Sequence, residues 1–165
     1  MILPNAEGKI WLVGGAVSKV LCEELYGTKT DEFDFDFICE KLKKKIIILK
    51  GWGVQYTKYG NPTFMKESIS VDFWPISDQY WIKENHLEPT IENFFVGVPF
   101  TIQAMAYDIK YRKVIGEIGI KALLDREIKV NNLAAAQKLV QRKGITINER
   151  MRSTAKNVGF RFISI

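Results

Sequence analysis

Hydrophobic and polar residues alternate along two segments of the chain, and this period of two predicts β-strands. Residues 33–37 read Phe-Asp-Phe-Asp-Phe, so a pleated strand would place the aromatic rings on one face and Asp34 and Asp36 on the other. Residues 70–74 read Ser-Val-Asp-Phe-Trp, which directs Val71 and Phe73 to the core and leaves Asp72 on the opposite face. We therefore expect two strands that each carry carboxylates on one face.

A strand, a glycine turn and a helix are predicted near the N-terminus. Residues 9–13 form a short apolar run that ends at Gly14 and Gly15, as in a buried strand that enters a tight turn. Apolar residues then recur at helical spacing from 16 to 25, and Gly27 marks the end of the helix.

The remaining elements follow from the same periodicities. Residues 41–50 are best interpreted as a helix with a basic face, although their apolar run 46–49 leaves a strand open. Residues 75–100 have a loop-like composition, and the apolar spacing of residues 101–107 suits a buried helix. Further strands are predicted at 54–58, 63–66, 69–74, 113–115 and 127–130, the first three antiparallel, and further helices at 118–124, 133–142 and 148–158.

The composition is that of one ordinary globular domain, with 165 residues of which 47% are hydrophobic and 26% charged. Apolar stretches such as 46–49 are far shorter than the roughly 20 residues of a membrane-spanning helix, so no membrane partner is expected. Because no export signal is recognisable, we expect a cytoplasmic protein in which Cys22 and Cys39 are buried, reduced thiols. A single histidine, His86, argues against His-based catalysis, and the net charge of +5 is a mild bias towards polyanions.

Asp34, Asp36 and Asp72 indicate metal-dependent chemistry. Residues two apart on a strand lie about 6.5 to 7 Å apart on one side, so Asp34 and Asp36 can converge on cations. Asp72 adds a third carboxylate if its strand pairs beside the first. Such like charges repel one another unless a divalent ion neutralises them, and carboxylate oxygens favour Mg²⁺ or Mn²⁺. Two such ions can support an in-line phosphoryl transfer.

The glycine turn adds a candidate phosphate site. Gly14 and Gly15 at a helix start offer backbone N–H groups to a nucleoside triphosphate, and the hydroxyl of Ser18 lies in the first helical turn. Each feature also has a plain interpretation. Alternating Phe and Asp is typical of a half-buried strand with a solvated face, and a Gly-Gly turn is common. The combination and order of the two features favour a nucleotide-handling site.

Four segments also resemble those of a known family, in the same order. Residues 12–17, Leu-Val-Gly-Gly-Ala-Val, resemble the opening Leu-Val-Gly-Gly-x-Val of the nucleotidyltransferase head domain of CCA-adding enzymes and bacterial poly(A) polymerases, in the polymerase-beta superfamily. The segment 34–36 resembles the family's metal-binding Asp-x-Asp. Residues 100–108 resemble its Phe-Thr-Ile-Asn-Ala-Leu-Ala-Tyr-Asp, and residues 119–130 resemble the segment that closes the head.

This resemblance implies an α+β protein with a polymerase-beta-like nucleotidyltransferase fold. Such a fold has a mixed, mostly antiparallel sheet, helices on one side and a short C-terminal helical neck. The head domain would span residues 1–130, and residues 131–165 would pack on it as a neck-like helical segment. The resemblance further implies two ions on Asp34 and Asp36, with Asp72 as the third carboxylate.

The chain also departs from the family pattern. Ser-Lys at 18–19 stands where the family usually has Arg-Asp, and Gly-Val-Pro at 97–99 replaces Arg-Arg-Asp. The base-selecting Glu-Asp-x-x-Arg is absent near 143–147, while in the following Arg-x-x-Arg helix Arg150 fits the first arginine and Ser153 replaces the second. CCA addition to tRNA by this chain alone is therefore not expected.

Basic residues gather on the last two predicted helices, at the position of the family's neck. Nucleic-acid binding is one hypothesis for them, and a solvated helix face is the other. The same two interpretations apply to the lysines within 41–45. The candidates for nucleic-acid binding are Arg142, Lys143, Arg150 and Arg152.

We therefore predict a minimal nucleotidyltransferase that moves a nucleoside monophosphate from an NTP to a hydroxyl acceptor, with RNA as the preferred acceptor. Asp34, Asp36 and Asp72 would hold Mg²⁺ or Mn²⁺, Asp72 would help to deprotonate the acceptor, and Gly14, Gly15 and Ser18 would hold the triphosphate. One alternative is a protein or small-molecule acceptor, as in toxin- or resistance-type members of the superfamily. The other is a non-catalytic, RNA-binding module with a head-like fold.

Overall fold

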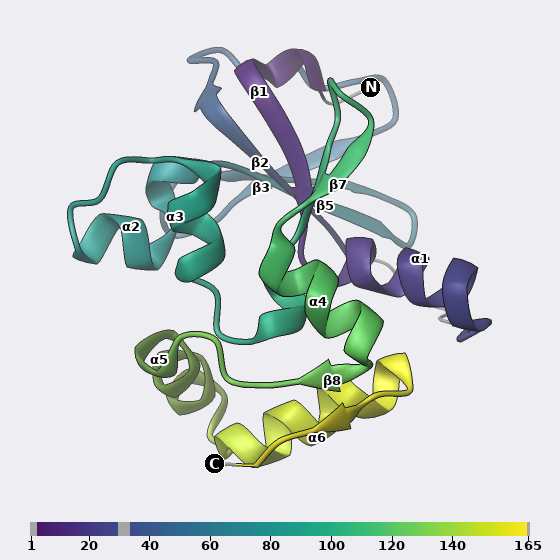
Figure 1. The fold of residues 1–165 in the computed structure, drawn as a ribbon. Helices are drawn as coiled ribbons and strands as arrows, with labels where there is room; N and C mark the ends of the chain where they lie inside the picture. The colour runs from purple at the N-terminus through teal and green to yellow at the C-terminus, as the bar shows by residue number, and fades with distance from the viewer. Residues whose placement is uncertain (1–2, 30–33, 165) are drawn as a thin grey trace.

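The computed structural model describes residues 3–29 and 34–164, which form an α+β fold around a seven-stranded sheet (Figure 1). All neighbouring strands are antiparallel except the central pair β2 and β5, which confirms the predicted mixed, mostly antiparallel sheet. In sheet order the strands are β3 (Gly53–Tyr56), β4 (Pro62–Lys66), β5 (Ile69–Pro75), β2 (Asp34–Leu42), β1 (Ala6–Val13), β6 (Ala106–Asp108) and β7 (Lys113–Ile115).

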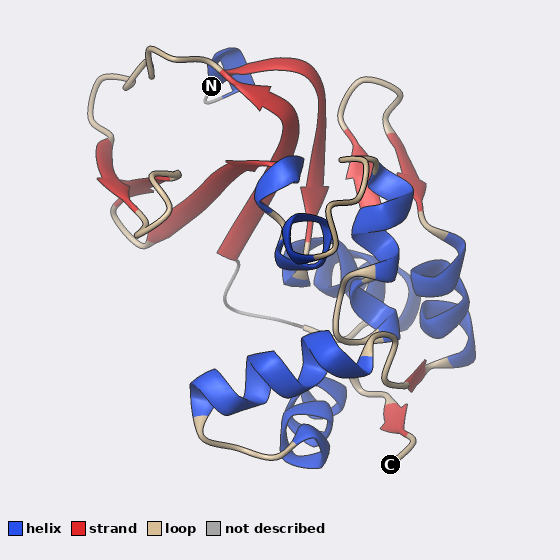
Figure 2. Ribbon diagram, turned by 90° about the vertical axis from the view of Figure 1, so that its left-hand side faces the viewer, coloured by secondary structure: helices blue, strands red, loops and turns tan. Residues whose placement is uncertain are grey.

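Helices lie around this sheet, and both views place the last two helices beyond one end of it (Figures 1 and 2). Two short strands, β8 (Glu127–Ile128) and β9 (Arg161–Phe162), pair separately in parallel. The α-helices are α1 (Gly15–Tyr26), α2 (Tyr80–Glu84), α3 (Ile91–Val96), α4 (Glu117–Asp125), α5 (Leu133–Lys143) and α6 (Ile147–Val158), and the 3₁₀ helices are η1 (Leu3–Asn5), η2 (Ile76–Asp78) and η3 (Thr101–Gln103).

Side chains of β2 alternate between two hydrophobic clusters, as its sequence predicts for the part that the structure describes; Phe33 lies outside the described residues. Phe35 and Phe37 pack with the apolar residues of β4 and β5 on one face. Ile38 packs on the other face, with α2 and α3. Asp36 shares the face of Ile38 because the two are separated by one residue.

Helices approach β1 from both sides, which refines the predicted one-sided arrangement. Trp11 packs in the cluster that includes α2 and α3, whereas the adjacent Leu12 packs against the cluster formed by α1, α4, α5 and α6. Successive side chains of a strand point to opposite faces. On the sheet face of the Phe35 cluster, Ile46 and Trp52 from the segment between β2 and β3 pack against the cluster.

Residues 41–50 are not helical, contrary to the expectation. β2 continues to Leu42, where its register places Leu42 opposite Ala6 of β1, so sheet pairing prevails over the helical spacing. The loop that follows is held by Asn5, whose side chain accepts a hydrogen bond from the Ile47 N–H at 2.6 Å and donates one to the Ile47 carbonyl at 3.0 Å.

Residues 75–100 and 101–107 also differ from the expectation. The first segment contains α2 and α3, two short helices whose caps are Gln79 and Thr90, and apolar burial against the sheet stabilises them. The second segment splits into η3 and β6, because Tyr107 and Asp108 pair with β1. Pairing with a distant strand is information that local periodicity does not contain.

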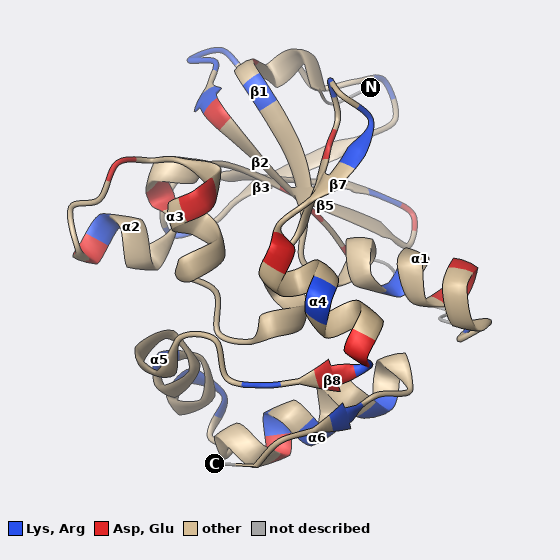
Figure 3. Ribbon diagram, viewed as in Figure 1, with Lys and Arg blue, Asp and Glu red and all other residues tan. Residues whose placement is uncertain are grey.

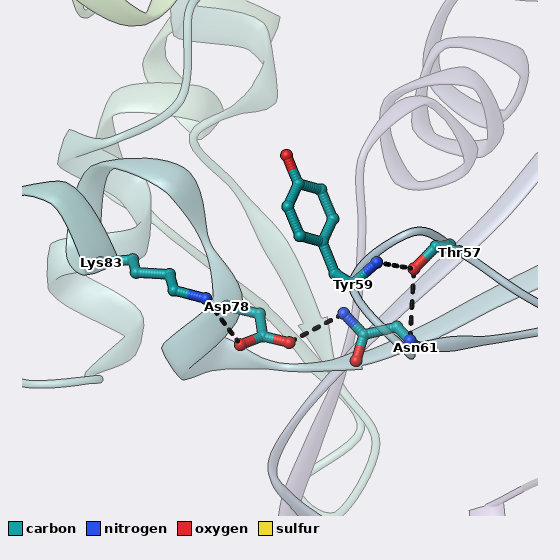
Figure 4. Close-up of polar contacts among 5 residues, drawn as sticks. All are labelled: Thr57, Tyr59, Asn61, Asp78 and Lys83. Carbon is teal, nitrogen blue, oxygen red and sulfur yellow. Dashed lines mark hydrogen bonds and ion pairs between the residues drawn. The ribbon is translucent and has the colours of Figure 1, made fainter.

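The turn between β3 and β4 is fastened to the segment after β5 (Figure 4). Thr57 Oγ1 accepts hydrogen bonds from the backbone N–H groups of Tyr59 and Asn61 at 3.3 and 3.2 Å. Asn61 Nδ2 donates to Asp78 Oδ2 at 2.8 Å, and Lys83 Nζ lies 4.0 Å from Asp78 Oδ1. This network ties β4 to η2 and α2.

Cys22 and Cys39 are buried free thiols, as predicted. Burial raises the pKa of Cys22 to about 11 and that of Cys39 to about 12. None of the helices in the described residues is long and apolar enough to cross a membrane.

Candidate active site

A cavity of about 470 Å³ lies where β2 and β5 meet α5 and α6. It brings together carboxylates from the sheet and cations from the helices, and Figure 3 shows the basic residues carried by α5 and α6. The carboxylates are Asp34, Asp36 and Asp72, the cations are Arg142, Lys143 and Arg150, and the other lining residues are Phe35, Ser70, Gln103 and Leu139.

The parallel pairing of β2 with β5 places the carboxylates side by side. In this register Asp36 lies opposite Asp72, and Asp34 lies opposite Ser70. β4 then adds Thr63, which lies opposite Asp72 and whose Oγ1 donates a hydrogen bond to Asp72 Oδ1 at 2.5 Å. The condition set by the sequence, that the strand of Asp72 pairs beside that of Asp34 and Asp36, is met.

Asp36 is the most perturbed of the three carboxylates. Burial, then the charge of Asp72, then that of Asp34, raises the pKa of Asp36 from its ordinary value of 3.8 to about 6. Each of these influences opposes the ionised form. A cation bound beside Asp36 would therefore relieve an unfavourable concentration of negative charge.

Gly14 makes the close approach that the site needs. Its φ of 75° lies in the left-handed region, and a Cβ at this position would lie 2.6 Å from Asp36 Oδ2. A glycine thus allows the β1–α1 turn to pass directly beside the Asp36 carboxylate. Gly15 is the first residue of α1.

Ser18 is placed differently from a free phosphate ligand. It is 6% exposed, and its hydroxyl donates a hydrogen bond to the Gly15 carbonyl at 3.1 Å. Ser18, Gly14 and Gly15 are not among the described residues that line the cavity.

The cations divide into those in the cavity and one outside it. Arg142 and Lys143 lie in the last turn of α5, and Arg150 lies in α6. Among the residues that the structure describes, none accepts a hydrogen bond from the buried Nε atom of Arg150. Arg152 lies outside the described lining, with its guanidinium carbon 5.8 Å from the centroid of the Phe162 ring.

Thr63 and Gln103 are site residues that the sequence does not reveal. Thr63 reaches Asp72 only through the pairing of β4 with β5. Gln103 lines the cavity from η3, and its Oε1 accepts a hydrogen bond from the Phe100 N–H at 3.3 Å. Its position within the family-like segment 100–108 is the one signal that could have pointed to it.

The carboxylate oxygens are the type of ligand that Mg²⁺ and Mn²⁺ prefer. Among the residues described, no three His, Cys, Asp or Glu side chains are placed close enough to hold a metal ion. The three carboxylates thus share a cavity without converging on a point. The pKa of Asp36, which burial and the charges of Asp72 and Asp34 raise, is the observation that fits a cation, because a cation beside this carboxylate would favour its ionised form.

No family model and no curated protein matches this chain. Solved structures do match it. A tRNA-processing enzyme with CTP matches at a TM-score of 0.60 and 17% identity, over 94% of this chain and 40% of the other. The Bacillus stearothermophilus CCA-adding enzyme in complex with CTP matches at 0.52 and 20%, over 93% of this chain and 36% of the other.

A tRNA nucleotidyltransferase complexed with a primer tRNA and an incoming ATP analog matches at a TM-score of 0.51 and 17% identity, over 92% of this chain. This chain spans less than half the length of these three proteins, with 36% to 47% of each covered. At such identities the likeness is one of fold. The expected resemblance is confirmed at that level: this chain has the nucleotidyltransferase fold of the CCA-adding enzymes, in a divergent form.

Proposed function

We propose that this protein transfers a nucleoside monophosphate from an NTP to a hydroxyl group of an RNA acceptor. The observation that carries the proposal is one cavity lined by three carboxylates from adjacent strands and three cations from α5 and α6. Oxygen ligands for divalent ions beside cations for phosphates are what phosphoryl transfer requires. The fold shared with CCA-adding enzymes supports this assignment.

Asp34, Asp36 and Asp72 would hold Mg²⁺ or Mn²⁺. When bound, such ions supply charge neutralisation at the phosphates and a more acidic acceptor hydroxyl. The residues of the chain supply the geometry, because the register of β2 and β5 fixes Asp36 beside Asp72. Thr63 orients Asp72 by donating to its Oδ1.

Phosphate groups would bind between the glycine turn and the helical cations. The start of α1 at Gly15 offers backbone N–H groups and the positive end of the helix dipole. Arg142, Lys143 and Arg150 add charge on the helical side of the cavity, and the unpartnered Arg150 Nε is a donor ready for a phosphate oxygen. These cations would compensate for the arginine that the family has where this chain has Ser-Lys at 18–19.

The transfer step is an in-line displacement at the α-phosphorus. The acceptor oxygen forms a bond to phosphorus, its proton passes to Asp72, and the bond to the bridging oxygen breaks to release pyrophosphate. Asp72 is suited to this role because only its Oδ1 accepts the bond from Thr63.

Labelled transfer tests the proposal directly. The chain is incubated with Mg²⁺, a short RNA and each ribonucleoside triphosphate labelled at the α-phosphate, and labelled RNA is resolved on a gel. Asp34→Asn and Asp36→Asn should each lower the rate at least about 100-fold, since each removes a carboxylate charge from the ion site. Asp125→Asn, which changes an exposed carboxylate paired with Lys121 at 3.0 Å, is the matched control.

Retained transfer in both variants would overturn the roles of these residues. Label that appears on a protein or a small molecule instead of RNA would select the toxin- or resistance-type acceptor. RNA binding without metal-dependent NTP binding, measured by calorimetry, would select a non-catalytic module.

A further inference from the structure

The tip of the β6–β7 hairpin combines an exposed aromatic ring with three cations. Residues 110–113 read Lys-Tyr-Arg-Lys, and all four are exposed. Tyr111 is 57% exposed, and the Nζ atoms of Lys110 and Lys113 lie 5.2 and 5.7 Å from its ring centroid. Within residues 3–29 and 34–164, no carboxylate pairs with these cations within 4.0 Å.

A hydrogen bond to a buried carboxylate anchors the tip. Asp108 is 4% exposed, and its Oδ1 accepts a hydrogen bond from the Tyr111 N–H at 2.9 Å. In the backbone register Asp108 lies opposite Lys113 across the hairpin, and Arg112 closes the turn with a φ of 52°. A preformed surface loses less conformational entropy on binding than a flexible loop does.

We infer that this tip is a binding surface for single-stranded RNA. Proteins that bind single strands combine cations, which contact successive phosphates, with aromatic rings on which bases stack. Tyr111 offers the ring, and Lys110, Arg112 and Lys113 offer the charge around it. The three cations alone could bind any polyanion. The Tyr111 ring between them favours a polyanion whose bases can stack on it.

The tip lies far from the cavity. Val13 of β1 pairs with Asp36, whereas Asp108 pairs with Trp11 and β6 runs antiparallel to β1, away from Val13. The Ile109 N–H donates to the Ile10 carbonyl, so the tip lies near the level of Lys9, roughly 13 Å along the strand from Val13. Figures 1 and 3 show the hairpin at the end of the molecule opposite α5 and α6.

RNA binding at the tip therefore requires neither an NTP nor a metal ion, and the inference stands apart from the proposed transfer. Fluorescence anisotropy with a labelled, dodecameric oligouridylate tests it in buffer without either. The chain, Tyr111→Ala and the triple variant Lys110→Ala/Arg112→Ala/Lys113→Ala are titrated at several salt concentrations from about 0.05 to 0.2 M. Circular dichroism verifies that each variant is folded.

Two matched controls accompany these variants. Tyr59→Ala removes another exposed tyrosine, 67% exposed, whose ring lies 5.0 Å from Lys58 Nζ on the β3–β4 turn. The triple variant Lys66→Ala/Lys83→Ala/Lys121→Ala removes the same charge from exposed lysines scattered over other elements.

Tyr111→Ala is expected to weaken binding roughly tenfold, as expected for loss of one stacked base. The tip triple variant is expected to lower the slope of log affinity against log salt by about 2, because about 0.7 is lost per phosphate contact. Both controls should bind within about twofold of the unchanged chain.

Wild-type affinity in both tip variants, or equal losses in the scattered triple variant, would overturn the inference. So would a loss of binding to phosphatidylserine vesicles with unchanged RNA affinity, which would assign the tip to a membrane surface. Asp36→Asn, which should lack transfer, should keep the tip-dependent RNA binding.

Discussion

At the scale of single residues, the ionisation of Asp36 should control how the stability of the metal-free protein depends on pH. Its pKa is raised to about 6, so the neutral form favours folding: that contribution is complete below about pH 4 and is lost as pH rises through about 6. Asp36→Asn should remove this loss and stabilise the protein at pH 7 by up to roughly 3 kcal/mol. Urea unfolding of both proteins between pH 4 and pH 7 measures the difference.

The comparison isolates Asp36, because Glu127 and Glu149, whose pKa values are lowered, titrate in both proteins. If the free energies of unfolding of the two proteins change in parallel with pH, the ionisation of Asp36 does not lower the stability.

Added Mg²⁺ provides a second prediction at this scale. If the ion neutralises the carboxylates, it should raise the melting temperature of the unchanged protein at pH 7 and have little effect on Asp36→Asn. Differential scanning fluorimetry with and without Mg²⁺ checks this. An equal rise in both proteins would place the ion elsewhere.

Gly14 is expected to tolerate alanine less well than Gly27, although both have positive φ. Gly14 has φ 75° and ψ −152°, a region that glycine alone adopts readily, and its added Cβ would meet Asp36 Oδ2 at 2.6 Å. Gly27 has φ 68° and ψ 18°, with nothing within 4 Å of an added Cβ. Gly14→Ala should therefore cost at least about 1 kcal/mol more, as measured by chemical denaturation. Equal costs would mean that the Asp36 carboxylate moves away freely.

At the scale of elements, Asn132 positions the helix that carries Arg142 and Lys143. Its Oδ1 accepts a hydrogen bond from the Ala135 N–H at 3.0 Å at the start of α5, and its Nδ2 donates to the Val96 carbonyl at 3.0 Å. The side chain thus caps α5 and joins it to the end of α3.

Asn132→Ala should cost about 2 kcal/mol, because it removes the cap and leaves the Val96 carbonyl without this donor. Asn132→Asp retains an acceptor for the cap and should cost less. Urea denaturation ranks the two variants. An alanine variant as stable as the aspartate variant would show that the cap contributes nothing.

The elements that the sequence predicts well are those with strong local signals. The structure confirms the alternation at 34–37, which lies in β2. It also confirms the strand before Gly14 and the helix after it, because periodicity and the glycine mark them locally. The sequence does not predict α2 and α3, because helices of five and six residues hold too few helical periods to stand out. Local spacing predicts a helix where β6 lies, because the strand depends on pairing with β1.

The candidate site divides in the same way. Asp34, Asp36 and Asp72 could be foreseen, since each lies on a predicted strand with a known facing direction. The contact of Thr63 with Asp72 depends on the pairing of β4 with β5, which no local pattern encodes.

At the scale of the whole molecule, one core joins the segments predicted as head and neck. Val17 and Phe100 share a hydrophobic cluster with Met151 and Ala155 of α6. We therefore expect residues 131–165 to unfold together with the rest.

Met151→Ala tests this expectation. Met151 is fully buried, and its truncation should cost about 3 kcal/mol. The four tryptophans all precede residue 131, so their fluorescence reports only the remainder of the chain. The denaturation midpoint seen by fluorescence should nevertheless fall as far as that seen by helical circular dichroism. A fall in the dichroism midpoint alone would identify the last two helices as an independent unit.

The two buried cysteines have a practical consequence. Because Cys22 and Cys39 are inaccessible and their pKa values lie near 11 and 12, they hold almost no reactive thiolate at neutral pH. A single cysteine introduced on the surface would react with maleimide dyes selectively, without removal of the native thiols. Fluorophores could thus be attached at chosen positions for distance measurements on the unaltered core.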